Sequence, residues 1–191
     1  MRLFLAVLVL IFSLQSLTKA DDIRDFEIEG MSIGDSLENH INNEKFKSYV
    51  TADYFKDNDF TLYQTTLSNF EEFKDVDISF LTKDNKKIIT SISGIIYLNY
   101  ENCIKKKKEI TDDIKIFLKG IKYYYEERTE NHGIDKTGKS KVYTNYFYFD
   151  SEDIIAVQCL DFSKELKYSD GLKLYIALDE YVDWIAYRAY K

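Results

Sequence analysis

The chain has few of the side chains that enzymes most often use for metal binding and acid–base chemistry. Its 191 residues include two histidines, two cysteines and one tryptophan, and no proline. A structural zinc site needs four ligands, drawn mostly from Cys and His. With so few candidate ligands, the sequence predicts no metal site and no cofactor.

Basic residues are also in the minority. The chain has 26 Lys and Arg against 33 Asp and Glu, which gives a formal net charge of −7. Binding to a phosphate backbone depends on displacing counterions with Lys and Arg. The one basic cluster, Lys105–Lys108, would spread around a helix as a solvated surface. We therefore expect no nucleic-acid partner.

Only one long apolar run occurs, and it lies at the start of the chain. Arg2 precedes the nearly continuous apolar stretch Leu3–Leu14, and a more polar stretch then ends at Ala20. This order is typical of a cleavable secretory signal, whereas a membrane span needs about 20 apolar residues. We expect residues 1–20 to be a secretory signal peptide and residues 21–191 to be one α+β domain without a transmembrane span.

The expected signal peptide bears on two properties of the mature protein, its net charge and the oxidation state of its cysteines. Loss of Arg2 and Lys19 takes the formal net charge from −7 to −9. Cys103 and Cys159 lie 56 positions apart, too far for a CxxC redox pair. An even cysteine count in an exported protein indicates a disulfide. We predict that Cys103 and Cys159 form a structural disulfide in a periplasmic or extracellular protein.

Hydrophobic patterning predicts strands on both sides of one long helix. The helix is expected over Asn102–Lys119, where Cys103, Ile110 and Ile114 follow helical spacing. Gly120 would cap it, and the three tyrosines at 123–125 would form its frayed end. Alternating residues predict strands at Asp25–Gly30, Phe60–Thr66, Val76–Thr82, Lys87–Asn99, Val142–Asp150, Ile154–Phe162 and Leu172–Asp179.

Two short helices complete the expected fold. One begins near Asp35 or Ser36, either of which could accept the free amides of the first turn. The other lies at the C-terminus and would cover an edge or an open face of the sheet with Trp184 and Ile185. Adjacent strands around one dominant helix favour an α+β fold. We expect a largely antiparallel sheet of about six strands in two meanders, packed against the long helix.

Two serine-hydrolase motifs overlap near the N-terminus. Residues 30–34 match G-x-S-x-G, the turn that presents a nucleophilic serine in α/β-hydrolases. The half-acidic strand before Ser32 is unlike the buried strand which that architecture needs. Residues 34–37 spell GDSL and resemble the block of the GDSL esterases and lipases. That resemblance implies Ser36 as the nucleophile.

The remaining GDSL blocks are absent. The family supplies a Gly-x-Asn-Asp block and a C-terminal Asp-x-x-His, and neither occurs here. His40 would share a helical face with Ser36, but a serine needs an oriented base and an oxyanion site. Ser36 and His40 are therefore weak catalytic candidates, and the sequence assigns no catalytic residue.

The strand at 142–150 carries aromatic residues on both of its faces. Tyr146 and Tyr148 share one face with Val142, while Tyr143 lies on the other face with two phenylalanines. At least one of these sets must contact something other than the main core. It can be the terminal helix, a partner, or a flat ligand such as a sugar ring. Tyr143, Tyr146 and Tyr148 are the candidate ligand-binding residues.

The stretch from Asp21 to Leu37 resembles a group of small exported proteins from low-GC marine bacteria, as does the pairing of a helix cysteine with a strand cysteine. The same stretch loosely resembles the turn that opens small envelope-assembly lipoproteins, but this chain lacks their lipid-bearing cysteine. These resemblances imply residence in the cell envelope and assign no catalytic residue.

From these observations we expect an exported, non-enzymatic binding domain, whose partner is an envelope protein or a small ligand. The alternative from another class is a GDSL-like serine esterase that uses Ser36. An inhibitor or immunity-type protein is a third possibility, suggested by acidity and a small disulfide-bonded domain.

Overall fold

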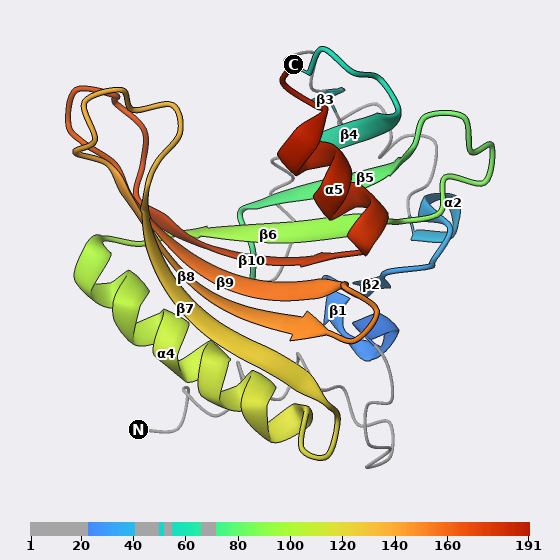
Figure 1. The fold of residues 1–191 in the computed structure, drawn as a ribbon, viewed down its shortest axis with the longest axis horizontal. Coiled ribbons are helices and arrows are strands. Elements are labelled where there is room, and N and C mark those ends of the chain that lie inside the picture. Colours follow the sequence, from blue (N-terminus) through green and yellow to red (C-terminus); the bar gives the residue numbers. More distant parts are fainter. Residues whose placement is uncertain (1–22, 41–49, 52–54, 66–71) are drawn as a thin grey trace.

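A computed structural model describes residues 23–40, 50–51, 55–65 and 72–191 (Figure 1). The expected signal peptide, residues 1–20, lies outside these residues. In chain order the helices and strands are η1 (Ile23–Asp25), β1 (Glu27–Ile28), β2 (Met31–Ser32), α2 (Leu37–His40), β3 (Val50–Thr51), β4 (Phe60–Thr65), β5 (Asp75–Leu81), β6 (Ser91–Tyr97), α4 (Tyr100–Phe117), β7 (Tyr123–Asn131), β8 (Lys141–Phe149), β9 (Ile154–Asp161), β10 (Gly171–Ala177) and α5 (Asp179–Tyr187).

The main sheet is antiparallel and is built from two meanders. Its strand order is β3-β4-β5-β6-β10-β9-β8-β7. The last strands of the two meanders, β6 and β10, are therefore neighbours in the middle of the sheet. β10 pairs with β6 over seven consecutive residue pairs, from Gly171–Tyr97 to Ala177–Ser91. The α+β class and the two antiparallel meanders are confirmed. No helix among the described residues is long and apolar enough to cross a membrane.

The expected number of about six strands is wrong. Over the described residues the main sheet has eight strands, and β1 and β2 form a separate hairpin. The main error is that β7 was not predicted: the tyrosines at 123–125 begin this strand instead of ending the long helix. Gly120 adopts a φ of +90° and ends the helical region. Tyr123 and Tyr125 then pack against the buried Phe147, at ring distances of 5.4 and 5.2 Å.

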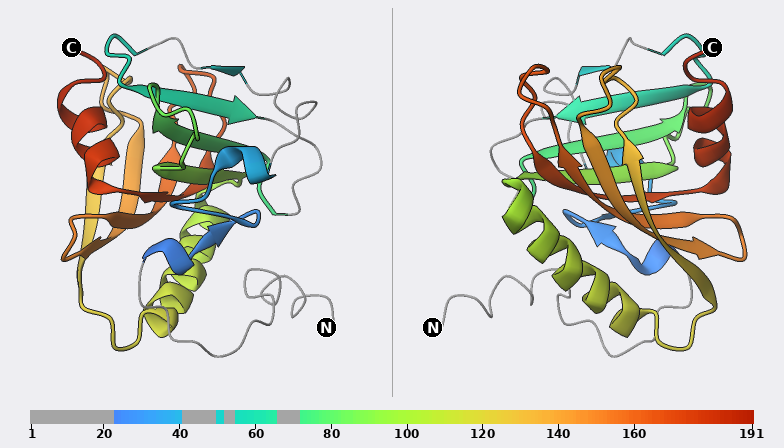
Figure 2. Two further views of the ribbon diagram at one scale, coloured as in Figure 1. Left: turned by 90° about the vertical axis from the view of Figure 1, so that its right-hand side faces the viewer. Right: turned by 60° about the vertical axis from the view of Figure 1, so that its left-hand side comes forward.

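One face of the sheet, here called the core face, is covered by α4 and the N-terminal hairpin (Figure 2). Cys103 and Ile114 of α4 are buried there, together with Ile28 and Met31 of the hairpin. Burying each aliphatic side chain of this size contributes roughly 1.5–3 kcal/mol. The core therefore occupies the space between the sheet and these two elements.

Helix α4 begins two residues earlier than expected, and its first turn is capped. The Asn99 side chain accepts a hydrogen bond from the Asn102 amide at 3.0 Å. Asn145 on β8 is buried beneath the helix; it accepts from Lys107 at 2.6 Å and donates to Thr111 at 3.0 Å. Burial lowers the pKa of Lys107. These directional contacts fix which side of α4 faces the sheet.

Gly94 lies in the regular ladder of β6, opposite Val76 and Leu174. A Cβ atom at this position would come within 2.3 Å of the Phe73 ring. The glycine is therefore needed for the close approach of Phe73 to the core face.

The predicted disulfide is confirmed. Cys103 and Cys159 are joined, with their Cα atoms 5.8 Å apart. Both side chains are fully buried, so the bond fastens the first turn of α4 to the middle of β9.

We predict that replacing both cysteines by alanine lowers the free energy of unfolding by about 3–4 kcal/mol, because the bond restricts the unfolded chain. Chemical denaturation followed by Trp184 fluorescence measures this difference. A loss below roughly 1 kcal/mol would show that the packing of α4 alone holds the helix on the sheet.

Candidate functional site

The face opposite α4, here called the open face, carries a group of polar side chains. Strand register places Asp77 beside Ser93, and Ser93 beside Tyr175. It also places Lys173 beside Gln158. Successive residues of a strand point to opposite sides. The neighbours of these residues, such as Ile78 and Leu172, therefore contribute to the core face.

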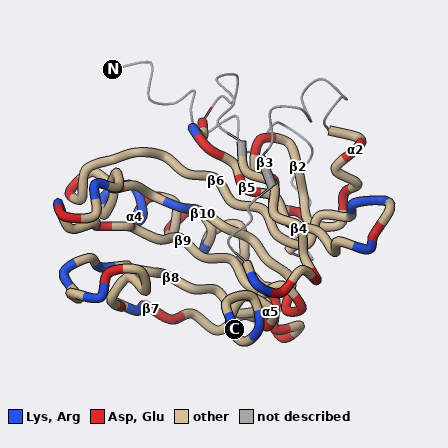
Figure 3. The backbone as a smooth tube through the Cα atoms, turned by 90° about the horizontal axis from the view of Figure 1, so that it is seen from above, with Lys and Arg blue, Asp and Glu red and all other residues tan. Residues whose placement is uncertain are grey.

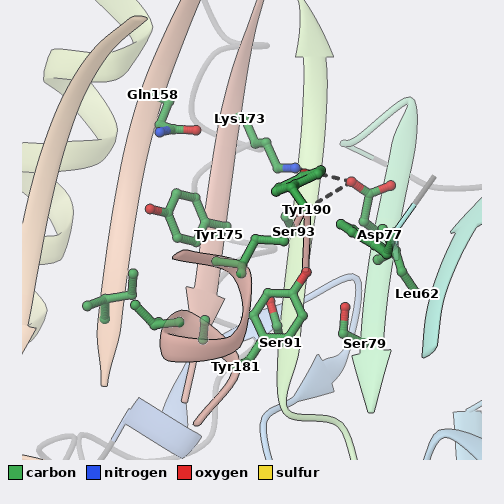
Figure 4. A pocket seen from close by; sticks show the side chains of 15 residues that line it. Leu62, Asp77, Ser79, Ser91, Ser93, Gln158, Lys173, Tyr175, Tyr181 and Tyr190 are labelled. Atoms are coloured by element: carbon green, nitrogen blue, oxygen red, sulfur yellow. Dashed lines mark hydrogen bonds and ion pairs between the residues drawn. The ribbon is translucent and has the colours of Figure 1, made fainter. Parts of the chain in front are cut away.

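A cavity of about 280 Å³ lies on the open face, between the sheet and α5 (Figure 4). Its floor comes from β5, β6, β9 and β10, and α5 contributes an apolar wall. The lining residues are Phe55, Leu62, Asp77, Ser79, Ser91, Ser93, Ile154, Gln158, Lys173, Tyr175, Ala177, Tyr181, Val182, Ile185 and Tyr190.

An ion pair crosses the floor of the cavity. Lys173 Nζ lies 3.1 Å from Asp77 Oδ2, and the two side chains are 28% and 13% exposed. Asp77 also accepts hydrogen bonds from Ser93 Oγ at 3.4 Å and from Gln64 Nε2 at 3.3 Å. The carboxylate is therefore held in place by three donors, each from a different strand.

Helix α5 is fixed over the open face at both of its ends. The Asp179 amide, in the first turn, donates to Asp153 Oδ1 at 2.9 Å. Trp184 is fully buried and donates from Nε1 to Asp57 Oδ1 at 2.9 Å. Arg188, just after the helix, forms an ion pair with Asp59 at 2.6 Å. The terminal helix thus covers the open face as expected, and Trp184 packs 5.1 Å from the ring of Phe60.

Two tyrosine hydroxyls in the cavity remain protonated at neutral pH. Burial raises the pKa of Tyr181 to about 12, although its hydrogen bond with Ser79 acts in the opposite direction. Burial also raises the pKa of Tyr175 well above its usual value, reinforced by the neighbouring Tyr146. Both groups can donate a hydrogen bond.

The structure brings together only two of the three tyrosines predicted to bind a ligand. Tyr146 and Tyr148 lie on the open face with stacked rings, whose centroids are 5.4 Å apart. Arg128 lies over both rings, at 5.3 and 5.9 Å. Tyr143 is on the core face, where its ring packs 5.3 Å from that of Tyr100. Tyr143 is therefore separated from the other two by the sheet.

The structure does not pair Ser36 with His40. Ser36 Oγ donates to the carbonyl oxygen of Lys86 at 2.7 Å. His40 Nε2 instead lies 2.8 Å from Asp35 Oδ2, which also accepts the Ser32 amide. Within the described residues no contact joins the Ser36 hydroxyl to a base. In the part of the chain that the structure describes, neither Asp35 nor Ser36 accepts an amide of α2 through its side chain, contrary to expectation.

Among the residues that the structure describes, no three His, Cys, Asp or Glu side chains gather in a way that could hold a metal ion. Both signs of charge are interspersed around the loops and strand ends (Figure 3).

No family model, curated protein or solved structure matches this chain. The resemblances suggested by the sequence therefore remain hypotheses. The function has to be inferred from the geometry of the open face.

The sequence analysis missed the main polar residues of this face, Asp77, Ser93 and Lys173. A signal was present, because Asp77 and Ser79 alternate with the apolar Val76, Ile78 and Phe80 in one strand. The pattern could not identify the partner of Asp77, because Lys173 lies 96 residues further along the chain.

We predict that alkaline pH weakens the fold partly through Tyr181. In the unfolded chain this tyrosine ionises near pH 10, whereas its folded pKa is about 12. Its contribution is therefore complete below pH 10 and is lost as the pH rises to about 12. The free energy of unfolding, measured by chemical denaturation between pH 9 and 12, should decline less steeply with pH for Tyr181→Phe than for the native chain. Equal slopes would contradict the burial of this hydroxyl.

We predict that a fluorophosphonate probe does not label Ser36, because its hydroxyl is hydrogen-bonded to the Lys86 carbonyl oxygen and has no adjacent base within the described residues. In-gel fluorescence should be the same for the native protein and Ser36→Ala, and should match a heat-denatured control. Labelling that disappears in Ser36→Ala would instead support the esterase alternative.

Proposed function

We propose that this chain is an exported, non-enzymatic binding domain that holds a small ligand in the open-face cavity. The observation that carries this proposal is the Lys173–Asp77 ion pair on the cavity floor. A partly buried ion pair is weak evidence for a role in stability, because desolvation offsets the attraction. Polar groups that converge in a partly apolar cavity are typical of ligand sites.

The size of the cavity limits the ligand. Its volume of about 280 Å³ is close to the lower end of the range for ligand pockets, roughly 300–1,000 Å³. A large cofactor or an extended peptide would not fit inside. A compact molecule with both polar and apolar surfaces suits a polar floor and an apolar wall.

The lining residues favour binding over catalysis. They include no histidine and no cysteine, the residues most often used as a general base or a nucleophile near neutral pH. The serine hydroxyls at 79 and 93 are engaged with Tyr181 and Asp77. The groups present can therefore hold a polar ligand without an evident route to activate a nucleophile.

Export is supported by two independent features. The disulfide between Cys103 and Cys159 suits an oxidising compartment. Residues 1–20 have the composition of a secretory signal. The resemblance of residues 21–37 to exported proteins agrees with the same location, periplasmic or extracellular.

The experiment is native mass spectrometry of the protein purified, without denaturation, from the compartment to which it is exported. We expect a bound small molecule in part of the population. Val182→Trp should remove it, because Val182 lines the cavity and an indole there would occupy the ligand's space.

Asp183→Trp is the matched control, since this neighbouring residue of α5 is exposed and does not line the cavity. It should retain the bound molecule. A protein that carries no ligand, or that loses it equally in both variants, would contradict the proposed site. An envelope protein that co-purifies without any small molecule would favour a protein partner instead.

A further inference from the structure

The charges of the cavity indicate an uncharged ligand. Lys173 and Asp77 are the two charged residues in its lining, and they already neutralise each other at 3.1 Å. A cation or an anion would be attracted by one member of the pair and repelled by the other, so the pair offers little net attraction to either ion. A zwitterion would have to separate the pair to form its own contacts. A neutral molecule can bind beside both groups and leave the ion pair intact.

The floor offers donors and acceptors at short separation. Within the described residues, the hydrogen bonds of Lys173 engage Asp77 alone, which leaves ammonium donors available. Gln158 donates to Thr144 through its nitrogen, so its carbonyl oxygen can accept. Ser91 lines the cavity, and its hydroxyl has no partner among the described residues. A ligand with several hydroxyl groups can donate to some of these atoms and accept from others.

The wall of the cavity that faces the polar floor is mainly apolar. Val182 and Ile185 of α5 line the cavity on this side. The ring of Tyr181 belongs to the same wall, whereas Tyr175 contributes its ring from the floor strand β10 (Figure 4). These groups present apolar surface with a hydroxyl at the end of each ring. The C–H face of a saturated ring can pack on such a wall while its hydroxyl groups point to the floor.

We propose that the ligand is a neutral, polyhydroxylated ring of monosaccharide size, with neighbouring hydroxyls that bridge Asp77 and Lys173. This inference rests on the proposed function, and it names the class of molecule which the open-face cavity would hold. In this arrangement Asp77 accepts from one hydroxyl, Lys173 donates to the next, and Ser91 contacts a further hydroxyl of the ring.

The test uses the methyl glycosides of glucose, galactose, mannose and N-acetylglucosamine, with alanine and leucine as zwitterionic probes. Saturation-transfer NMR detects binding, and calorimetry measures the dissociation constant. We expect at least one glycoside to bind with a constant of roughly 1 mM or below, and neither amino acid to bind more tightly. Binding confined to the amino acids, or no binding of any glycoside, would overturn the proposal.

Three variants locate the binding site. Asp77→Asn should weaken glycoside binding at least about ten-fold, since hydrogen bonds to charged groups are the stronger ones. Ser91→Ala should weaken it roughly three- to ten-fold, and the fold should tolerate this change because the hydroxyl has no hydrogen-bond partner among the described residues. Lys122→Gln, which removes an exposed ion pair with Asp150, should leave binding unchanged. Unchanged affinity in Ser91→Ala would contradict this placement even if Asp77→Asn failed to fold.

The glycoside test and the test of the proposed function can fail independently of each other. If native mass spectrometry shows a bound molecule that Val182→Trp removes, while no glycoside binds, the cavity remains a ligand site and only the ligand class is wrong. If the protein carries no small molecule and binds no glycoside, both proposals fail.

Discussion

The antiparallel pairing of β6 with β10 is the constraint on which the site depends. β6 ends at Tyr97 and β10 begins at Gly171, so α4 and three strands intervene. Once the two strands are in register, Ser93 lies opposite Tyr175. Asp77 joins from β5 because β5 pairs with β6. A shift of one residue in the β6–β10 pairing would move the polar residues of β10 to the core face.

Two features hold this register in place. Gly171 allows the backbone of β10 to approach β6, since a Cβ there would come within 2.8 Å of the Ile96 carbonyl oxygen. The disulfide ties α4 to β9, which is the other neighbour of β10. The core face and the open face are formed by the same strands. Changes to the core face can alter the cavity only through this common backbone.

Local patterning accounts for what the sequence analysis predicted correctly. Alternation in β8 assigned Tyr146 and Tyr148 to one face and Tyr143 to the other, as observed. The helical spacing of Cys103 and Ile114 identified the buried stripe of α4. The main error in the strand count has a clear cause. β7 is an edge strand that is mostly exposed and rich in charged residues, so it lacks a regular apolar alternation and its identity depends on pairing with β8.

The same reasoning explains why the motif in the sequence and the site in the structure do not coincide. The GDSL letters at 34–37 were conspicuous because four residues are adjacent in sequence, yet Ser36 is used in a backbone contact with Lys86. The Lys173–Asp77 pair carries no motif, since its members lie 96 residues apart. A binding site on a sheet face is assembled across strands, so its residues are dispersed in sequence while their spacing in space is fixed by the ladder. For this chain, the register of the strands is thus better evidence of function than any contiguous motif.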